Sequence, residues 1–175
     1  MASTQRSVVA TILFVVLGGP GWLLVYLPWW MTRFRVAVAE PVWQMALAGA
    51  LILVGLAPLF ESTLRFIFVG RGTLVPAVPT ERLVVTGLYR YVRNPMYLGV
   101  FTTLGGEVLL FRSRDLLTEF LICALAVHLF VLLYEEPTLA RRHPAEYPLY
   151  KNSVPRWLPR LTPWSGPANP SSAQF

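Results

Sequence analysis

A dense polar and aromatic cluster, YRYVRNPMYLG at residues 89–99, stands directly before a long apolar run. Pro95 suits the first turn of a helix, because its missing N–H group would have no helical partner there. The free N–H groups of such a helix start attract anionic groups such as a carboxylate, and Arg90 and Arg93 add positive charge. The segment predicts either a ligand site for an anion or an ordinary membrane-span start with interfacial tyrosines and lipid-binding arginines.

A second polar set, Glu135 and Glu136, follows the next apolar run. A helix end already carries partial negative charge, so two adjacent carboxylates there favour a bound donor such as a sugar diol, an ammonium group or nearby arginines. The alternative is a solvated helix end, with Pro137 opening a new helix. If the two apolar runs form a hairpin, the polar cluster and the two acids should border one cavity.

Such a cavity would suit a ligand that combines a carboxylate, a diol and an aromatic base. S-adenosylmethionine has all three, and its sulfonium can be stabilised by aromatic faces through cation–π attraction.

The composition indicates an integral membrane protein. Apolar residues make up 55% of the chain and charged residues only 14%, against about 25% in soluble domains. The net charge of +6 is attributed to topology and anionic lipid headgroups, and nucleic-acid binding is not expected. With Cys123 as the single cysteine, neither an intrachain disulfide nor a cysteine zinc cluster is possible, and no metal site is expected.

We predict an all-α, polytopic membrane helical bundle, because a bilayer core needs about 20 apolar residues per helix. A tight hairpin is expected at RSRD, residues 112–115, and a short interfacial helix and a wrapped, proline-rich segment should follow the last span. The four expected transmembrane helices are residues 8–30, 42–69, 95–111 and 116–134.

The chain is expected to divide into an N-terminal two-span region, a cofactor-binding core and a flexible tail, at residues 1–70, 71–162 and 163–175. Lys and Arg are concentrated on the side that four spans assign to both termini, which places the termini and the site in the cytoplasm.

Four further polar residues fall inside the apolar runs. Glu61 and Arg65 are four residues apart, the spacing of a helical ion pair. Glu107 and His128 are expected either to form a buried hydrogen bond or to line a substrate tunnel.

Two segments, TGLYRYVRNPMYLG and EEPTLARRHPAEYPLYKNSVPRWLP, resemble the isoprenylcysteine carboxyl methyltransferase and phospholipid methyltransferase family. The resemblance covers residues 72–162. It implies a cytoplasm-facing site for S-adenosyl-L-methionine in a helical membrane bundle, with no metal.

The resemblance also implies site residues. Arg156 is expected to orient the methyl acceptor, and Glu136 to act as base if the acceptor is an amine or phenol. Asn94 stands where the prenylcysteine enzymes commonly have His, and an asparagine cannot shuttle a proton. The residues expected to contact the cofactor are Arg93, Asn94, Pro95, Tyr97, Leu98, Gly99, Glu135, Glu136, Tyr147 and Tyr150.

The acceptor is expected to be lipophilic, either a small molecule, a prenylated substrate or a membrane lipid, and the resemblance does not choose between a carboxylate, an amine, a phenol and a thiol. A competing hypothesis is an NADPH-dependent sterol-type membrane reductase, which carries a similar R-H-P-x-Y element. In such proteins an acidic residue often follows the motif, whereas here Val100 follows Gly99. A third hypothesis is a non-enzymatic scaffold or lipid-binding protein. The sequence assigns no oligomeric state.

Overall fold

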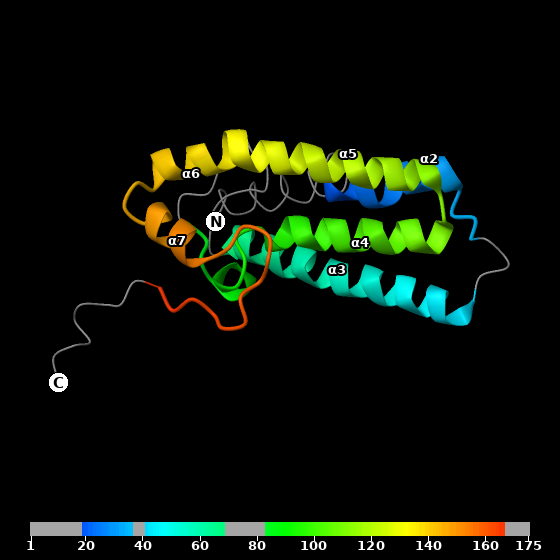
Figure 1. Cartoon of the computed structure of the whole chain (residues 1–175), viewed down its shortest axis with the longest axis horizontal. Coiled ribbons are helices and arrows are strands. Elements are labelled where there is room, and N and C mark those ends of the chain that lie inside the picture. Colours follow the sequence, from blue (N-terminus) through cyan, green and yellow to red (C-terminus); the bar gives the residue numbers. More distant parts are fainter. Residues whose placement is uncertain (1–18, 37–40, 69–82, 167–175) are drawn as a thin grey trace.

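The computed structural model describes residues 19–36, 41–68 and 83–166, and in these ranges the chain contains helices and no strand. The expected all-α class is therefore confirmed for the described part. Figure 1 shows the long helices side by side, with the short C-terminal helix packed at one end. The helices in chain order are η2 (Trp22–Tyr26, a π-turn), α2 (Leu27–Thr32), α3 (Val42–Phe68), η3 (Gly87–Arg90, a 3-10 turn), α4 (Pro95–Phe111), α5 (Arg114–Phe130), η4 (Val131–Glu135, a π-turn), α6 (Glu136–Arg142) and α7 (Tyr147–Ser153).

Among the described residues, two helices are long and apolar enough to cross a membrane, α3 over Val42–Arg65 and the continuous helix Arg114–Arg142. α4 is also apolar, but its 17 residues extend only about 26 Å against a hydrocarbon core of about 30 Å. Residues 8–18 of the first expected span lie outside the described residues. The described part of this span contains η2 and most of α2. The expectation of four spans therefore remains a prediction.

The hairpin between α4 and α5 forms where it was expected. α4 ends at Phe111, and Arg112 takes the left-handed conformation, with φ of 48°. Ser113 then caps α5, since its hydroxyl oxygen accepts a hydrogen bond from the N–H of Leu116 at 3.4 Å. Two residues thus reverse the chain.

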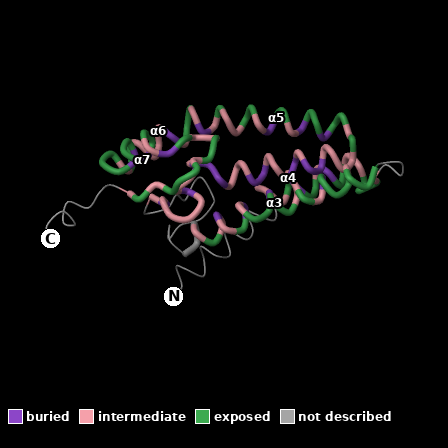
Figure 2. The backbone as a smooth tube through the Cα atoms, turned by 60° about the horizontal axis from the view of Figure 1, so that its bottom comes forward, coloured by how far each residue is buried: buried purple, intermediate pink, exposed green. Residues whose placement is uncertain are grey.

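α3 and α4 pack closely because glycines face each other across the contact. A Cβ on Gly55 would lie 2.6 Å from the backbone nitrogen of Thr103, and one on Gly99 would lie 2.6 Å from the carbonyl oxygen of Gly55. Small residues of this kind let helix backbones approach each other in a membrane. The buried residues of α4 follow this contact along the helix (Figure 2).

The fourth span was expected to end near Tyr134, and this expectation is wrong. The helix continues through η4 and α6 to Arg142. Pro137 does not end it, because the wider π-turn η4 directly precedes this proline and relieves its clash with the preceding turn. Glu135 and Glu136 therefore lie inside a continuous helix and not at a negatively charged helix end.

After α7 the chain runs extended along the segment that precedes α4. The N–H of Arg93 donates to Pro155 O, the N–H of Arg160 to Tyr91 O, and the N–H of Trp164 to Arg90 O, each at 2.9 Å. These backbone bonds hold residues 155–164, here called the C-terminal strap, across the start of α4.

Candidate functional site

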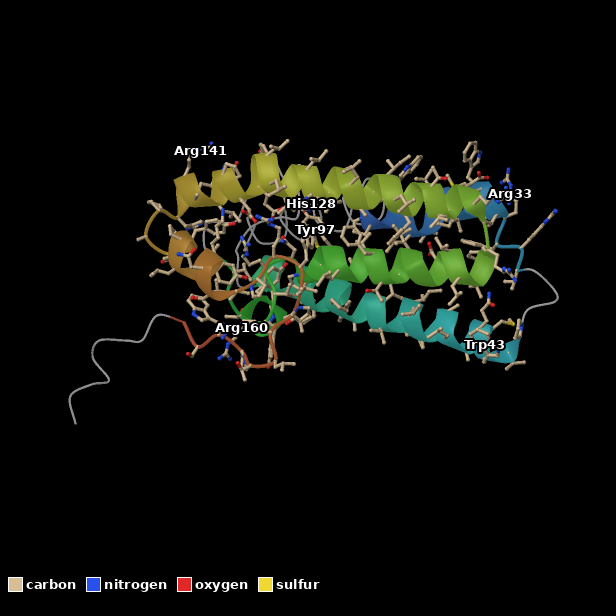
Figure 3. The ribbon with its side chains drawn as sticks, in the orientation of Figure 1. Arg33, Trp43, Tyr97, His128, Arg141 and Arg160 are labelled. Carbon is tan, nitrogen blue, oxygen red and sulfur yellow. The ribbon has the colours of Figure 1, made fainter. Side chains whose placement is uncertain are left out.

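The start of α4 and the junction between η4 and α6 meet at the end of the bundle that carries the C-terminal strap. The hydroxyl of Tyr97 donates to Glu135 Oε2 at 3.0 Å, and Arg93 Nη1 donates to Glu136 Oε1 at 2.8 Å. Figure 3 shows Tyr97 in the space between α4 and the long upper helix, with His128 next to it in this view. The two polar sets of the sequence thus lie side by side.

Glu136 is the centre of an ionic cluster. Its side chain is only 6% exposed, and that of Arg93 is 9% exposed. Arg156 binds both carboxylate oxygens, with Nε at 2.5 Å and Nη2 at 3.0 Å, and Lys151 Nζ lies 2.9 Å from Oε2. Bidentate arginine–carboxylate pairs are among the strongest hydrogen-bonded ion pairs. Arg93, Lys151 and Arg156 therefore surround one carboxylate from three elements of the fold.

The balance of charge in this region favours an anionic ligand group. Glu135 adds a second carboxylate, so three cations face two acids. The Nε of Arg93 is buried and, within the described residues, has no hydrogen-bond partner. A buried donor without an acceptor is costly, so a ligand carboxylate that reached this nitrogen would be stabilised there.

Tyr147 and Tyr150 of α7 close the cluster from the other side. Tyr147 lies 3.4 Å from Arg93 Nη1, and the hydroxyl of Tyr150 donates to Tyr89 O at 2.7 Å. Burial raises the pKa of both tyrosines above the ordinary value. Both hydroxyls therefore stay protonated and serve as hydrogen-bonding groups.

Tyr150→Phe is expected to destabilise the protein by roughly 1–3 kcal/mol, because it leaves the buried carbonyl of Tyr89 without its donor. Thermal unfolding in detergent would measure this loss. Tyr134→Phe, on an exposed tyrosine of the long helix, is the matched control and should change little. Equal melting temperatures for the two variants would contradict the role given to this bond.

The remaining expected site residues have different surroundings. Asn94 does not cap α4 with its side chain; its Nδ2 donates to the carbonyl of Arg156 at 3.2 Å. Pro95 is buried in the first turn of α4, and Leu98 is half-buried. Gly99 packs against Gly55 of α3, so its small size serves the contact between helices.

Of the two alternatives expected for Glu107 and His128, the structure contradicts the hydrogen bond, and the substrate tunnel stays a prediction. His128 Nδ1 accepts a hydrogen bond from Trp157 Nε1 at 3.1 Å, so His128 pairs with the C-terminal strap and not with Glu107. The ring of Trp157 also lies 5.8 Å from that of Phe101, between centroids. The ion pair expected between Glu61 and Arg65 is confirmed.

Lys151 and Trp157 are the site neighbours that sequence reasoning did not identify. Lys151 lies four residues after Tyr147 on α7, and that spacing places both on one helix face. Trp157 carried no comparable signal, because it lies in a segment without helical periodicity. Within the described ranges, no group of three or more His, Cys, Asp or Glu side chains could hold a metal ion.

Comparison with protein families gives one match. A family model described as phospholipid methyltransferase matches residues 43–146, which is more than half of the chain. This range includes α3 to α6 and ends just before Tyr147, so α7 and the C-terminal strap lie outside it. Comparison with curated proteins and with solved structures gives no match.

Proposed function

Because the chain belongs to the phospholipid methyltransferase family, a family of membrane-integral methyltransferases, we propose that it transfers a methyl group from S-adenosylmethionine to a lipid acceptor. The observation that carries this proposal is the meeting of the Tyr97–Glu135 pair with the ionic cluster around Glu136. Hydrogen-bond donors with positive charge, such as Arg93, and the acceptor Glu135 then border the same region. A zwitterionic nucleoside ligand requires both kinds of group.

We assign the cofactor's carboxylate to the unpartnered Nε of Arg93 and its donor groups to Glu135. When bound, S-adenosylmethionine supplies a methyl group activated by a sulfonium centre. The chain's own residues hold the reactants and exclude water, and such alignment can supply several kcal/mol of the barrier reduction. Tyr147, Tyr150 and the C-terminal strap would cover this site.

The geometry favours a positioning role for Glu136 over the base role expected from the sequence. Three cations occupy its two oxygens, which leaves no free lone pair for an incoming proton. A carboxylate acceptor would arrive ionised and would need no base. For an amine acceptor, Glu135 is the better candidate for the base. Its carboxylate accepts a hydrogen bond from the hydroxyl of Tyr97, whereas that of Glu136 is bound by three cations.

The role of Arg156 in orienting the acceptor remains part of the proposal. Its Nε and Nη2 are held by Glu136, and this hydrogen bond raises the pKa of Arg156 further above its ordinary value. The guanidinium is therefore a fixed positive charge that could hold a carboxylate or phosphate group of the acceptor through Nη1.

We also propose that this end of the bundle faces the cytoplasm. Arg141, Arg142 and Lys151 all lie at this end, and cytoplasmic segments of membrane proteins carry an excess of Lys and Arg. The cofactor would then reach the site directly from the compartment in which it is made.

The proposed function predicts that Tyr97→Phe weakens binding of S-adenosylhomocysteine, the demethylated cofactor, by about tenfold, or roughly 1.4 kcal/mol. The variant removes a hydroxyl that donates to Glu135, so the Glu135 carboxylate is no longer held in the position from which it would contact the ligand. Calorimetry on the purified protein in detergent would measure the affinity, with Tyr134→Phe as the matched control.

The same assay separates the competing hypotheses. A reductase would bind NADPH and not S-adenosylhomocysteine, and a scaffold would bind neither. Incubation of the protein with radiolabelled cofactor and total membrane lipid, followed by identification of the labelled product, would then define the acceptor. A protein that binds NADPH alone would overturn the proposal.

A further inference from the structure

An open hollow lies on the outer side of α3, where the η3 turn and the residue after it pack over this helix. Its volume is about 640 Å³, which falls within the roughly 300–1,000 Å³ of typical ligand sites. None of its lining residues belongs to the ionic cluster around Glu136. The hollow is lined by Val54, Ala57, Pro58, Glu61, Gly87, Leu88, Arg90 and Tyr91.

The floor of the hollow is apolar and continuous with the lipid-facing surface of α3. Val54 is 64% exposed, and its neighbours Leu53 and Phe60 are 71% and 70% exposed. Ala57 is exposed as well. In a membrane this surface would contact acyl chains, so an amphipathic ligand suits the hollow better than a small water-soluble one.

The rim carries the positive charge of Arg90, which no carboxylate of the described residues compensates. Arg90 Nε donates to the carbonyl of Trp164 at 2.6 Å, and in the described part of the chain its two terminal nitrogens have no partner. Glu61 is already paired with Arg65, which also donates to Thr86 at 2.9 Å. The hydroxyl of Tyr91 likewise has no partner among the described residues. Arg90 and Tyr91 can therefore bind a phosphate oxygen.

Two of the residues that line the hollow carry hydrogen-bond acceptors that lack an expected partner. Pro58 has no N–H group, so the carbonyl of Val54, one turn earlier in α3, receives no helical hydrogen bond from it. Glu61 Oε2 has no partner within the described residues. Unpaired polar groups at membrane depth cost free energy, and a headgroup hydroxyl that reached the buried Glu61 Oε2 would pair with it.

The η3 turn that forms the roof is held close to the Glu61–Arg65 pair. Gly87 has a φ of 59°, and a Cβ at this position would collide with both side chains. The roof and the cationic rim are thus fixed relative to the floor on α3.

We propose that this hollow binds an anionic phospholipid whose headgroup carries hydroxyl groups, at a site separate from the methyl-transfer site. The phosphate contacts Arg90 and Tyr91, the headgroup hydroxyls donate toward Glu61, and an acyl chain lies along Val54 and Ala57. The lipid bridges α3 and the segment that leads into α4. Free phosphate is not the expected ligand, because it would leave the apolar floor uncovered.

The test measures binding of dioctanoyl phosphatidylglycerol to the delipidated full chain in detergent by calorimetry. Dioctanoylglycerol lacks the phosphate, dioctanoyl phosphatidylcholine carries its own cation and no hydroxyl donor, and inorganic phosphate lacks the chains. Each of these three ligands is expected to bind at least tenfold more weakly. Equal binding of any one of them would overturn the corresponding part of the proposal.

Two variants test the location. Ala57→Trp fills the hollow from an exposed position and should reduce phosphatidylglycerol affinity at least tenfold, whereas Ala46→Trp, an exposed alanine on the same helix outside the hollow, should not. Tyr91→Phe removes one hydroxyl and should cause a loss of several fold. Unchanged affinity in both Ala57→Trp and Tyr91→Phe would overturn the site.

Binding of S-adenosylhomocysteine should be unaffected by Ala57→Trp, since Ala57 lies outside the ionic cluster. This readout separates the lipid site from the proposed methyl-transfer function, because either can fail while the other holds.

Discussion

Glu136→Gln is expected to destabilise the protein by about 3–5 kcal/mol, the cost of removing one partner from a buried ion pair. The substitution keeps the size of the side chain but removes its charge. Arg93, whose side chain is 9% exposed, then keeps its charge without a counter-ion, and Arg156 and Lys151 lose their common partner. α7 and the C-terminal strap should therefore separate from the long helix.

Two measurements check this expectation. Thermal unfolding in detergent should show a large drop in melting temperature, and limited proteolysis should cut within residues 143–164 faster than in the wild-type protein. Glu146→Gln, on an exposed glutamate at the start of α7, makes the same chemical change outside the cluster. If it destabilises the protein as much as Glu136→Gln, the ionic cluster does not hold the strap.

Gly55→Val is expected to have an effect of similar size, a loss of about 3 kcal/mol or more, because overpacking against backbone leaves little room for adjustment. Its Cβ would lie 2.6 Å from the backbone nitrogen of Thr103 and 2.7 Å from the carbonyl oxygen of Gly99. α3 and α4 would have to move apart, and the start of α4 carries Tyr97. The variant should therefore lose both thermal stability and binding of S-adenosylhomocysteine.

Gly49→Val is the matched control for this change. It lies on the same helix, but a Cβ there has no heavy atom within 4 Å apart from its own stretch of helix backbone, so the variant should fold and bind as the wild-type protein does. If Gly55→Val were as stable as Gly49→Val, the close approach of α3 and α4 would not depend on glycine.

The helices of the bundle could be predicted well where local signals define them. Pro95 sets the start of α4, and the polar residues after Phe111 set its end, so the expected range of 95–111 agrees with the structure. α3 was expected to begin at residue 42 and does begin at Val42, and Phe68 is the last described residue of this helix. For α4 a long apolar run ends at charged residues that lie next to it in the chain.

The continuation of the last long helix could not be predicted in the same way. Pro137 normally indicates a helix boundary, and the π-turn that allows the helix to continue has no sequence signature comparable to a cap. The expectation of a helix end at Tyr134 therefore followed a sound local rule that the wider turn of η4 overrides.

In the candidate site, too, the contacts with a local sequence signal could be predicted and the others could not. The pairing of the α4 start with Glu135 and Glu136 follows from a two-residue hairpin, which a short polar link predicts. The partner of Gly99 was not predictable, because it depends on how α3 is rotated against α4. Trp157 was missed for a related reason: its contact with His128 joins a helix to an extended segment, and no periodicity relates the two.

The pairing of residues 155–164 with the segment before α4 also bears on how the protein is synthesised. Asn94 and Arg156 are 62 positions apart in the chain, and Arg90 and Trp164 are 74 apart. The segment before α4 therefore leaves the ribosome more than sixty residues before its partners in the strap. The pairing around the start of α4 can form only after the strap has emerged, so a product shortened before residue 155 would lack the backbone bonds that hold this end of the bundle.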